Sequence, residues 1–178
     1  MNIHFRMIKV FMAAFFRRKT ASNPLVPFIM PMRVWPMDLD FNLHKNNGRY
    51  LTTMDVGRMD MAFRAGLHKP MLKYKWMPLL GSSTIRYFRS LRPFQKFDLV
   101  TQIVGWDDKW VFIEQKFISN DKLYAVAGVK VLFRGPDGNV PTETLLHYAN
   151  IEQKTPELPA WIQQWHLADR KLGETYRK

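Results

Sequence analysis

Apolar residues recur with two different periods along the chain, and each period predicts a different kind of element. From about Arg49 to Ala65 the spacing is that of one side of a helix. The apolar stripe consists of Leu51, Met54, Met61 and Ala65. Further apolar residues widen this stripe, so we expect a helix that is largely enclosed by protein. Gly66 follows at the position expected of a helix C-cap.

The period changes to two from Leu79 onward, where β-branched and aromatic residues alternate with polar ones. The predicted strands are Ser83–Leu91, Asp98–Gly105, Trp110–Ser119 and Lys122–Phe133. Three of them are joined by short turn sequences that leave no room for a crossover, so this part of the sheet must be antiparallel. The remaining expected elements are an extended segment before the helix (Phe28–Val34) and two short helices in the tail (Glu143–Ile151 and Pro159–Leu167).

The order of these elements predicts an α+β domain in which a curled antiparallel sheet carries one long central helix. We divide the chain into a basic amphipathic N-terminal segment (1–24), the main domain (25–155) and a C-terminal helical tail (156–178). A chain of 178 residues with 47% apolar residues is of the right size for one such domain.

The composition limits the chemistry that the chain can support. There are no cysteines, which excludes disulfides and thiolate catalysis. The five histidines form no HxxxH or HxH pair, so we predict no metal site. The net charge of +12 favours anionic partners, but no Gly-rich loop, recognition-helix motif or ribonucleoprotein signature indicates nucleic acid.

The N-terminal segment differs from the rest of the chain. Residues 1–20 hold five basic residues and no acid, and the apolar run Val10–Phe16 is much shorter than a transmembrane helix. A basic stretch follows the apolar part, where a signal peptide would have small residues. Such a segment either lies on an anionic membrane surface or packs on its own domain or a partner subunit. We expect a cytoplasmic protein, and peripheral membrane contact through residues 1–20 stays open.

The chemically richest stretch, residues 38–50, leads into the predicted helix. It contains two carboxylates, one imidazole and two adjacent amides. The start of a helix exposes unpaired N–H groups that can stabilise an oxyanion, and a nearby carboxylate can act as a base or a nucleophile. The alternative is that Asp40 and the asparagines only cap the helix and its turn, as these residue types often do.

The stretch reads Asp38-x-Asp40-x-x-Leu43-His44-x-Asn46-Asn47-x-x-Tyr50. It resembles the signature of hotdog-fold thioesterases in the 4-hydroxybenzoyl-CoA thioesterase branch, Asp-x-Asp-x-x-Gly-His-x-Asn-Asn-x-x-Tyr. The resemblance covers about residues 27–168 and is strongest to the subgroup called thioesterase superfamily member six. The matching segments outside the motif are Gly66-Leu67, Arg92-Pro93, Gly105–Lys109 and Pro156–Pro159.

The resemblance implies a hotdog fold and hydrolysis of thioesters of coenzyme A or of an acyl carrier. It implies that Asp40 is the catalytic base or nucleophile and that the N–H near Asn47 polarises the thioester carbonyl. His44 matches a family histidine near the active site. The alternative is that His44 is only a loop histidine held by hydrogen bonds. Three further residues match family positions that shape the loop and bind substrate: Asp38, Asn46 and Tyr50. Leu43 departs from the family glycine, and leucine there narrows the pocket or changes the turn.

A group of basic residues that includes Arg86 and Arg92 is a candidate for the phosphates of coenzyme A, which enters as part of the substrate and not as a cofactor. An ordinary solvated charged face is the alternative. The resemblance also implies a homodimer or homotetramer with active sites between subunits. The rival function is a non-catalytic acyl- or lipid-binding protein at membrane surfaces, which the basic N-terminal segment and Leu43 both favour.

Overall fold

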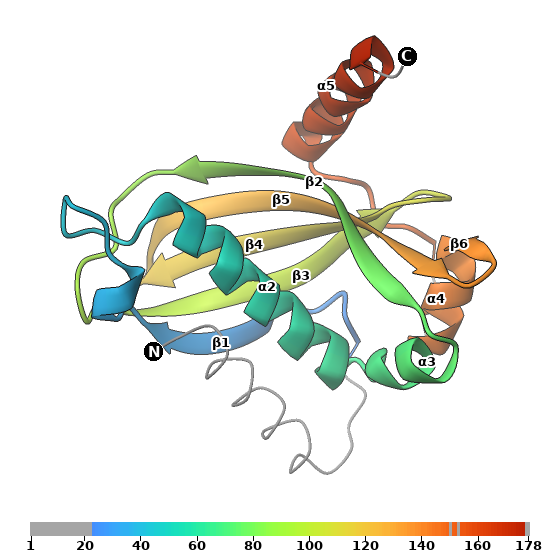
Figure 1. Ribbon diagram of the computed structural model, residues 1–178, viewed down its shortest axis with the longest axis horizontal. Coiled ribbons are helices and arrows are strands. Elements are labelled where there is room, and N and C mark those ends of the chain that lie inside the picture. Colours follow the sequence, from blue (N-terminus) through green and yellow to red (C-terminus); the bar gives the residue numbers. More distant parts are fainter. Residues whose placement is uncertain (1–22, 150, 153, 177–178) are drawn as a thin grey trace.

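A computed structural model describes residues 23–149, 151–152 and 154–176 of the chain. The predicted N-terminal segment lies mostly outside these residues. The described strands form one antiparallel sheet in the order β1-β3-β4-β5-β2, and a short β6 pairs with β5 (Figure 1). The strands are β1 (Phe28–Arg33), β2 (Met77–Tyr87), β3 (Lys96–Trp106), β4 (Val111–Ser119), β5 (Lys122–Gly135) and β6 (Gly138–Val140).

The long helix α2 (Asn47–Arg64) runs along one face of this sheet, as the hotdog fold requires (Figure 1). It begins two residues before the predicted start and ends one residue before the predicted Ala65, which is its C-cap. Gly66 has a φ of 76° and completes a Schellman motif: its own N–H donates to Phe63 O, and the N–H of Leu67 donates to Ala62 O. The predicted α+β architecture is therefore confirmed.

The remaining helices are the 3-10 turn η1 (Pro36–Asp38), α3 (His68–Lys73), α4 (Thr142–Tyr148) and α5 (Ala160–Tyr176). The sequence did not predict α3, in which Pro70 occupies the first turn, where a missing N–H costs no helical hydrogen bond. Helix α5 continues about nine residues beyond the predicted end at Leu167. These later residues are mostly exposed and polar, so apolar spacing does not mark them.

Strand β2 differs most from its prediction, because it starts at Met77 and ends at Tyr87 instead of covering Ser83–Leu91. Pro78 lies inside it, and proline is tolerated because β2 is an edge strand that pairs only with β5. Residues that follow Tyr87 turn away to form the loop before β3. The free edge of β2 is thus 11 residues long and includes exposed apolar side chains.

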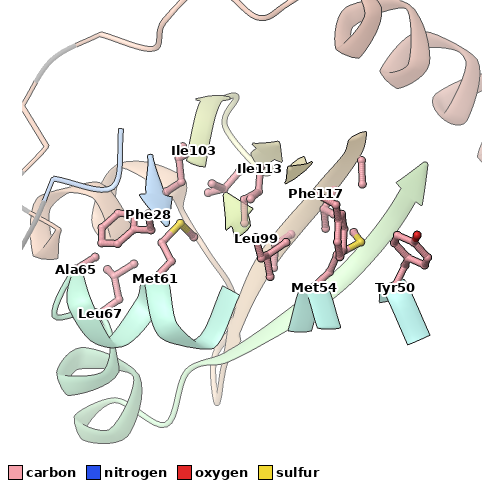
Figure 2. Packing of buried hydrophobic residues seen from close by; sticks show 14 of the residues in the cluster. Phe28, Tyr50, Met54, Met61, Ala65, Leu67, Leu99, Ile103, Ile113 and Phe117 are labelled. Atoms are coloured by element: carbon pink, nitrogen blue, oxygen red, sulfur yellow. The ribbon is translucent and has the colours of Figure 1, made fainter. Parts of the chain in front are cut away.

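The core lies between α2 and the sheet, where buried side chains from both meet (Figure 2). Met54 and Met61 of α2 face Leu99 and Phe117 of the sheet, and all four are at most 4% exposed. Gly57 allows the helix to approach closely, since a Cβ there would lie 2.5 Å from the Leu99 side chain and 2.8 Å from Thr101 Oγ1. The helix is therefore fixed in register and height over the sheet.

Helix α5 begins on the opposite face of the sheet from α2. Gly128 of β5 leaves room for the rings of Trp161 and Trp165, and Lys130 two residues later pairs with Asp169. Lys130 is only 5% exposed, so this ion pair ties the middle of α5 to the sheet. No helix within the described ranges is both long and apolar enough to cross a membrane.

Candidate functional site

The carboxylate of Asp40 organises the turn that precedes α2. Its Oδ1 accepts hydrogen bonds from the backbone N–H groups of Asn42 (2.9 Å) and His44 (3.3 Å). Backbone bonds close the same turn, from Asp40 N to His44 O and from Leu43 N to Asp40 O. Among the described residues, nothing donates to the other oxygen, Oδ2. One oxygen of Asp40 therefore holds the loop while the second is available for chemistry.

Asp38 and Lys45 anchor this loop to its surroundings. Asp38 is 4% exposed, and its Oδ2 accepts from Trp35 N while its carbonyl accepts from Asn46 N (2.7 Å). Lys45 N donates to Leu91 O in the loop before β3. The predicted residues Asp38, Asp40, His44 and Asn46 are thus brought together at the N-terminal end of α2. His44 is partly exposed there and contributes its backbone N–H and carbonyl to the turn.

The start of α2 presents the backbone N–H of Asn47 as a donor. Asn46 is the N-cap, and its side chain accepts from Gly48 N (2.9 Å), while Arg49 N donates to the Asn46 carbonyl. Within the described part of the chain, no acceptor engages the N–H of Asn47. Since the first N–H groups of a helix carry its positive dipole end, this donor suits a developing negative charge.

Tyr50, in the first turn of α2, anchors the start of the helix in the core. It is 2% exposed, and its ring contacts those of Tyr87 (5.0 Å between centroids) and Phe117 (4.7 Å). Burial raises the pKa of Tyr50 to about 12, against the lowering effect of a hydrogen bond with the backbone of Leu91. The phenol therefore stays neutral at physiological pH and holds the loop on the core.

The two arginines predicted to meet coenzyme A lie near the same end of the domain. Arg86 is exposed near the C-terminal end of β2, next to Tyr87, whose hydroxyl lies 3.5 Å from Asn47 O. Arg92 is exposed in the loop whose Leu91 carbonyl binds Lys45 N. Both positions are compatible with phosphate contacts, which stay a prediction.

Leu43 adopts a left-handed backbone conformation, which glycine favours. Its φ is 55°, in the left-handed region, and its side chain is 66% exposed. The Leu43 side chain therefore points toward solvent and not into the core. An L-residue in this region is strained by roughly 1–2 kcal/mol.

Replacing Leu43 with glycine should raise the free energy of unfolding by about 1 kcal/mol, because the strain disappears and little buried apolar area is lost. Urea denaturation of the full chain measures the change. Leu43→Ala is the matched control, since it removes the same side chain but keeps the Cβ that causes the strain. Equal stabilities of the glycine and alanine variants would contradict this interpretation.

A separate apolar cavity of about 340 Å³ lies between the second half of α2 and the sheet. Its lining comes from α2, α3, four strands and α4, and it includes buried residues such as Met61, Leu67 and Ile113 (Figure 2). Asp55 is the first α2 residue to line it, eight residues or about 12 Å along the helix from Asn47. Within one chain, the Asp40 loop and this cavity are therefore at different ends of the helix.

Two charged side chains of α2 line the cavity. Asp55 is 55% exposed and pairs with Arg58, whose side chain is 15% exposed. The Arg58 Nη1 also donates to Gln115 Oε1 (2.9 Å), and Gln115 Nε2 donates to Met54 O and Thr101 Oγ1. Burial lowers the pKa of Arg58, an effect that the charge and hydrogen bond of Asp55 oppose. The network fixes the guanidinium beside the cavity.

Sequence patterns did not predict three further residues of this region: Lys45, Arg58 and Gln115. Lys45 is 3% exposed and donates to Thr53 Oγ1 (2.9 Å) beneath the helix start. The spacing of Asp55 and Arg58 on one helix was a signal for an ion pair. Gln115 lies among the apolar residues of a predicted strand, and this position indicates a buried polar side chain. Nothing in the sequence identifies the groups that it bonds.

Residues 34–166 match the thioesterase-like superfamily. This match covers well over half of the chain. The chain belongs to the thioesterase-like superfamily. Protein THEM6 of Xenopus laevis is 33% identical over 132 residues, which are 74% of this chain, and protein THEM6 of Danio rerio is 32% identical over 133 residues, which are 75% of it. The matched regions span 63% and 65% of those two proteins, less than two thirds of either.

The fold of this thioesterase-like chain also resembles solved structures. The probable thioesterase YbaW from Escherichia coli superposes with a TM-score of 0.64 at 17% sequence identity, over 69% of this chain and 96% of that one. At this identity the likeness shows the fold alone. The membership and the hotdog fold implied by residues 38–50 are thus confirmed, while the roles of the single site residues stay predictions.

Proposed function

We propose that this thioesterase-like chain hydrolyses acyl thioesters of coenzyme A or of an acyl carrier. The observation that carries the proposal is the pair of groups at the start of α2: an Asp40 carboxylate oxygen without a donor and an Asn47 N–H without an acceptor among the described residues. A carboxylate beside a free helix N-terminus supplies a base or nucleophile and an oxyanion donor. The chain's membership of the thioesterase-like superfamily supports the same chemistry.

The reaction divides between these two groups. The thioester carbonyl oxygen accepts from the Asn47 N–H, which favours the charge that develops on it. As a base, Asp40 takes a proton from water while the water oxygen bonds to the carbonyl carbon; the C–S bond then breaks and the thiolate takes up the proton. As a nucleophile, Asp40 forms an acyl anhydride with the same loss of thiolate, and water opens it. One well-aimed oxyanion donor contributes about 2.7–4 kcal/mol.

The proposed active unit is a homodimer joined through the free edges of two β2 strands. Tyr87, at the C-terminal end of β2, lies beside Asn47, whereas Pro78 and Leu80, near its N-terminal end, line the cavity. Antiparallel pairing of two β2 edges about a twofold axis places opposite ends of the strands side by side. The Asp40 loop of one subunit then faces the cavity of its partner, and the two regions complete one site.

Non-catalytic acyl binding is the second candidate, because the apolar cavity alone provides a place for an acyl chain and Asp40 Oδ1 is used by the turn. Contact of residues 1–20 with an anionic membrane belongs to this candidate and concerns residues outside the described part. A cytoplasmic location also remains a prediction.

Thiol release from a panel of acyl-CoA thioesters distinguishes the two candidates. The full chain is incubated with acetyl-, hexanoyl-, decanoyl-, palmitoyl- and 4-hydroxybenzoyl-CoA, and free coenzyme A is measured with a thiol reagent. We expect saturable release from at least one of these thioesters. Binding of the thioesters without release from any of them would contradict hydrolysis and support the acyl-binding candidate.

A further inference from the structure

The cavity beside α2 has the surface of a site for hydrocarbon. Every side chain that lines it is apolar except Asp55 and Arg58. Met61, Leu67, Ile103 and Ile113 are each at most 5% exposed and form its apolar inner wall, whereas Leu80 is 55% exposed and belongs to the part of the wall that opens to solvent. Its volume of about 340 Å³ lies at the small end of the usual range for ligand sites, roughly 300–1,000 Å³.

The two charged side chains of the cavity wall, Asp55 and Arg58, pair with each other, and Asp55 is exposed to solvent. Arg58 is held by Asp55 and by Gln115, and Gln115 is fully buried beneath the helix. No other described side chain in the lining has a hydrogen-bonding group. A hydroxyl group carried into this cavity would lose its bonds to water and find no side-chain partner in the apolar wall, which costs free energy.

The shape of the wall also favours a flexible chain. Three methionines, Met59, Met61 and Met71, come from α2 and α3 and can adapt to an unbranched guest. An apolar cavity of about 150 Å³ already admits one benzene ring, so 340 Å³ accommodates a chain on the order of ten carbons.

We infer that the cavity between the second half of α2 and the sheet binds the acyl part of the substrate, and that the acyl part is an unbranched aliphatic chain of medium length. Hydroxylated aromatic acyl groups are disfavoured. This inference rests on the proposed function for the identity of the carrier, but binding of the chain does not depend on turnover.

Non-hydrolysable S-alkyl thioethers of coenzyme A test this assignment with the full chain. Isothermal titration is run with the butyl, octyl and decyl thioethers and with the 4-hydroxybenzyl thioether. We expect the Kd to fall by about fourfold for each added CH2 group up to the decyl chain. The 4-hydroxybenzyl thioether should bind no more tightly than the butyl one. A Kd independent of chain length, or tighter binding of the hydroxybenzyl group than of the decyl group, would overturn the inference.

Variants locate the binding to this cavity. Ala62 lines it, so Ala62→Phe should fill it and remove the gain in affinity beyond the butyl thioether. Ala168→Phe, at an exposed position of α5, is the matched control and should keep the wild-type series. Ala62→Leu, a smaller change, shortens the preferred chain if the phenylalanine variant does not fold. An unchanged series in a folded Ala62 variant would place the acyl chain elsewhere.

The same titration separates this inference from the proposed function. Chain-length-dependent binding of the thioethers together with no thiol release from decanoyl-CoA leaves the cavity assignment standing and removes the hydrolase. The opposite result is thiol release from decanoyl-CoA together with thioether affinities that do not depend on chain length. It leaves the hydrolase standing and removes the cavity assignment.

Discussion

Asp40→Asn is expected to lower kcat for thioester hydrolysis by roughly 10²–10⁴-fold, the usual contribution of a general acid–base group. The amide keeps an oxygen that can accept from Asn42 N and His44 N, so the turn should persist. The substitution removes only the carboxylate oxygen that would accept a proton or attack the thioester carbonyl. Steady-state thiol release measures kcat, and KM should change little because no substrate contact is removed.

Asp107 provides a control that matches Asp40 in its structural role. Its Oδ1 accepts from Lys109 N (2.8 Å) and Trp110 N (2.6 Å) in the turn between β3 and β4. Asp107→Asn therefore tests what an acid-to-amide change does to a carboxylate that caps a turn and whose second oxygen lies 3.7 Å from His166 Nε2. Equal activity in the Asp40 and Asp107 variants would show that Asp40 is a turn residue and not a catalytic one.

Gln115→Met should lower the free energy of unfolding by about 3 kcal/mol, because several buried polar groups lose their partners at once. Gln115 is fully buried and bonds Arg58 (2.9 Å), Met54 O (3.0 Å) and Thr101 Oγ1 (2.9 Å). Methionine is close to glutamine in size, so the loss reflects polarity and not a cavity. Urea denaturation gives the value, and the released Arg58 should also weaken binding of the longer thioethers.

Gln164→Met on α5 is the matched control, since this position is exposed and surface substitutions usually change stability by about 0.5 kcal/mol or less. A Gln115 variant as stable as the control would mean that the bonds among α2, β3 and β4 contribute nothing to stability.

The apolar periods of the sequence were sufficient to predict the central helix and the antiparallel sheet, because burial on one side leaves a repeat that local spacing reveals. Gly66 was a correct helix stop for the same local reason. The start of β2 at Met77 was not predicted. Residues on both faces of this edge strand are exposed, so apolar and polar residues do not alternate clearly along it. Pro78 also resembles a strand breaker unless the strand is known to be at an edge.

The candidate site was predictable only in part. Residues 38–50 are contiguous, so their grouping at the start of α2 follows from local chain geometry. The network at the cavity joins Arg58 to Gln115, 57 residues later, and no local pattern encodes that contact. The cavity itself depends on how α3 and α4 close the end of the sheet, and α3 was not expected at all. Tertiary packing therefore decides where an acyl chain fits.

In the proposed homodimer, the Asp40 loop of one subunit works with the cavity of the other, and a heterodimer of two variants distinguishes this arrangement from a site within one chain. One chain carries Asp40→Asn and the other Ala62→Phe, each with its own affinity tag, and the doubly tagged dimer is purified after co-expression. In that dimer one composite site holds both substitutions and the second holds neither.

Hydrolysis of decanoyl-CoA by this heterodimer is the decisive measurement. Both parent homodimers should be nearly inactive, and the heterodimer should recover about half of the wild-type rate, because one of its two symmetry-related sites is intact. If each site instead lay within a single chain, both sites of the heterodimer would carry a substitution. A heterodimer as inactive as its parents would contradict the shared site.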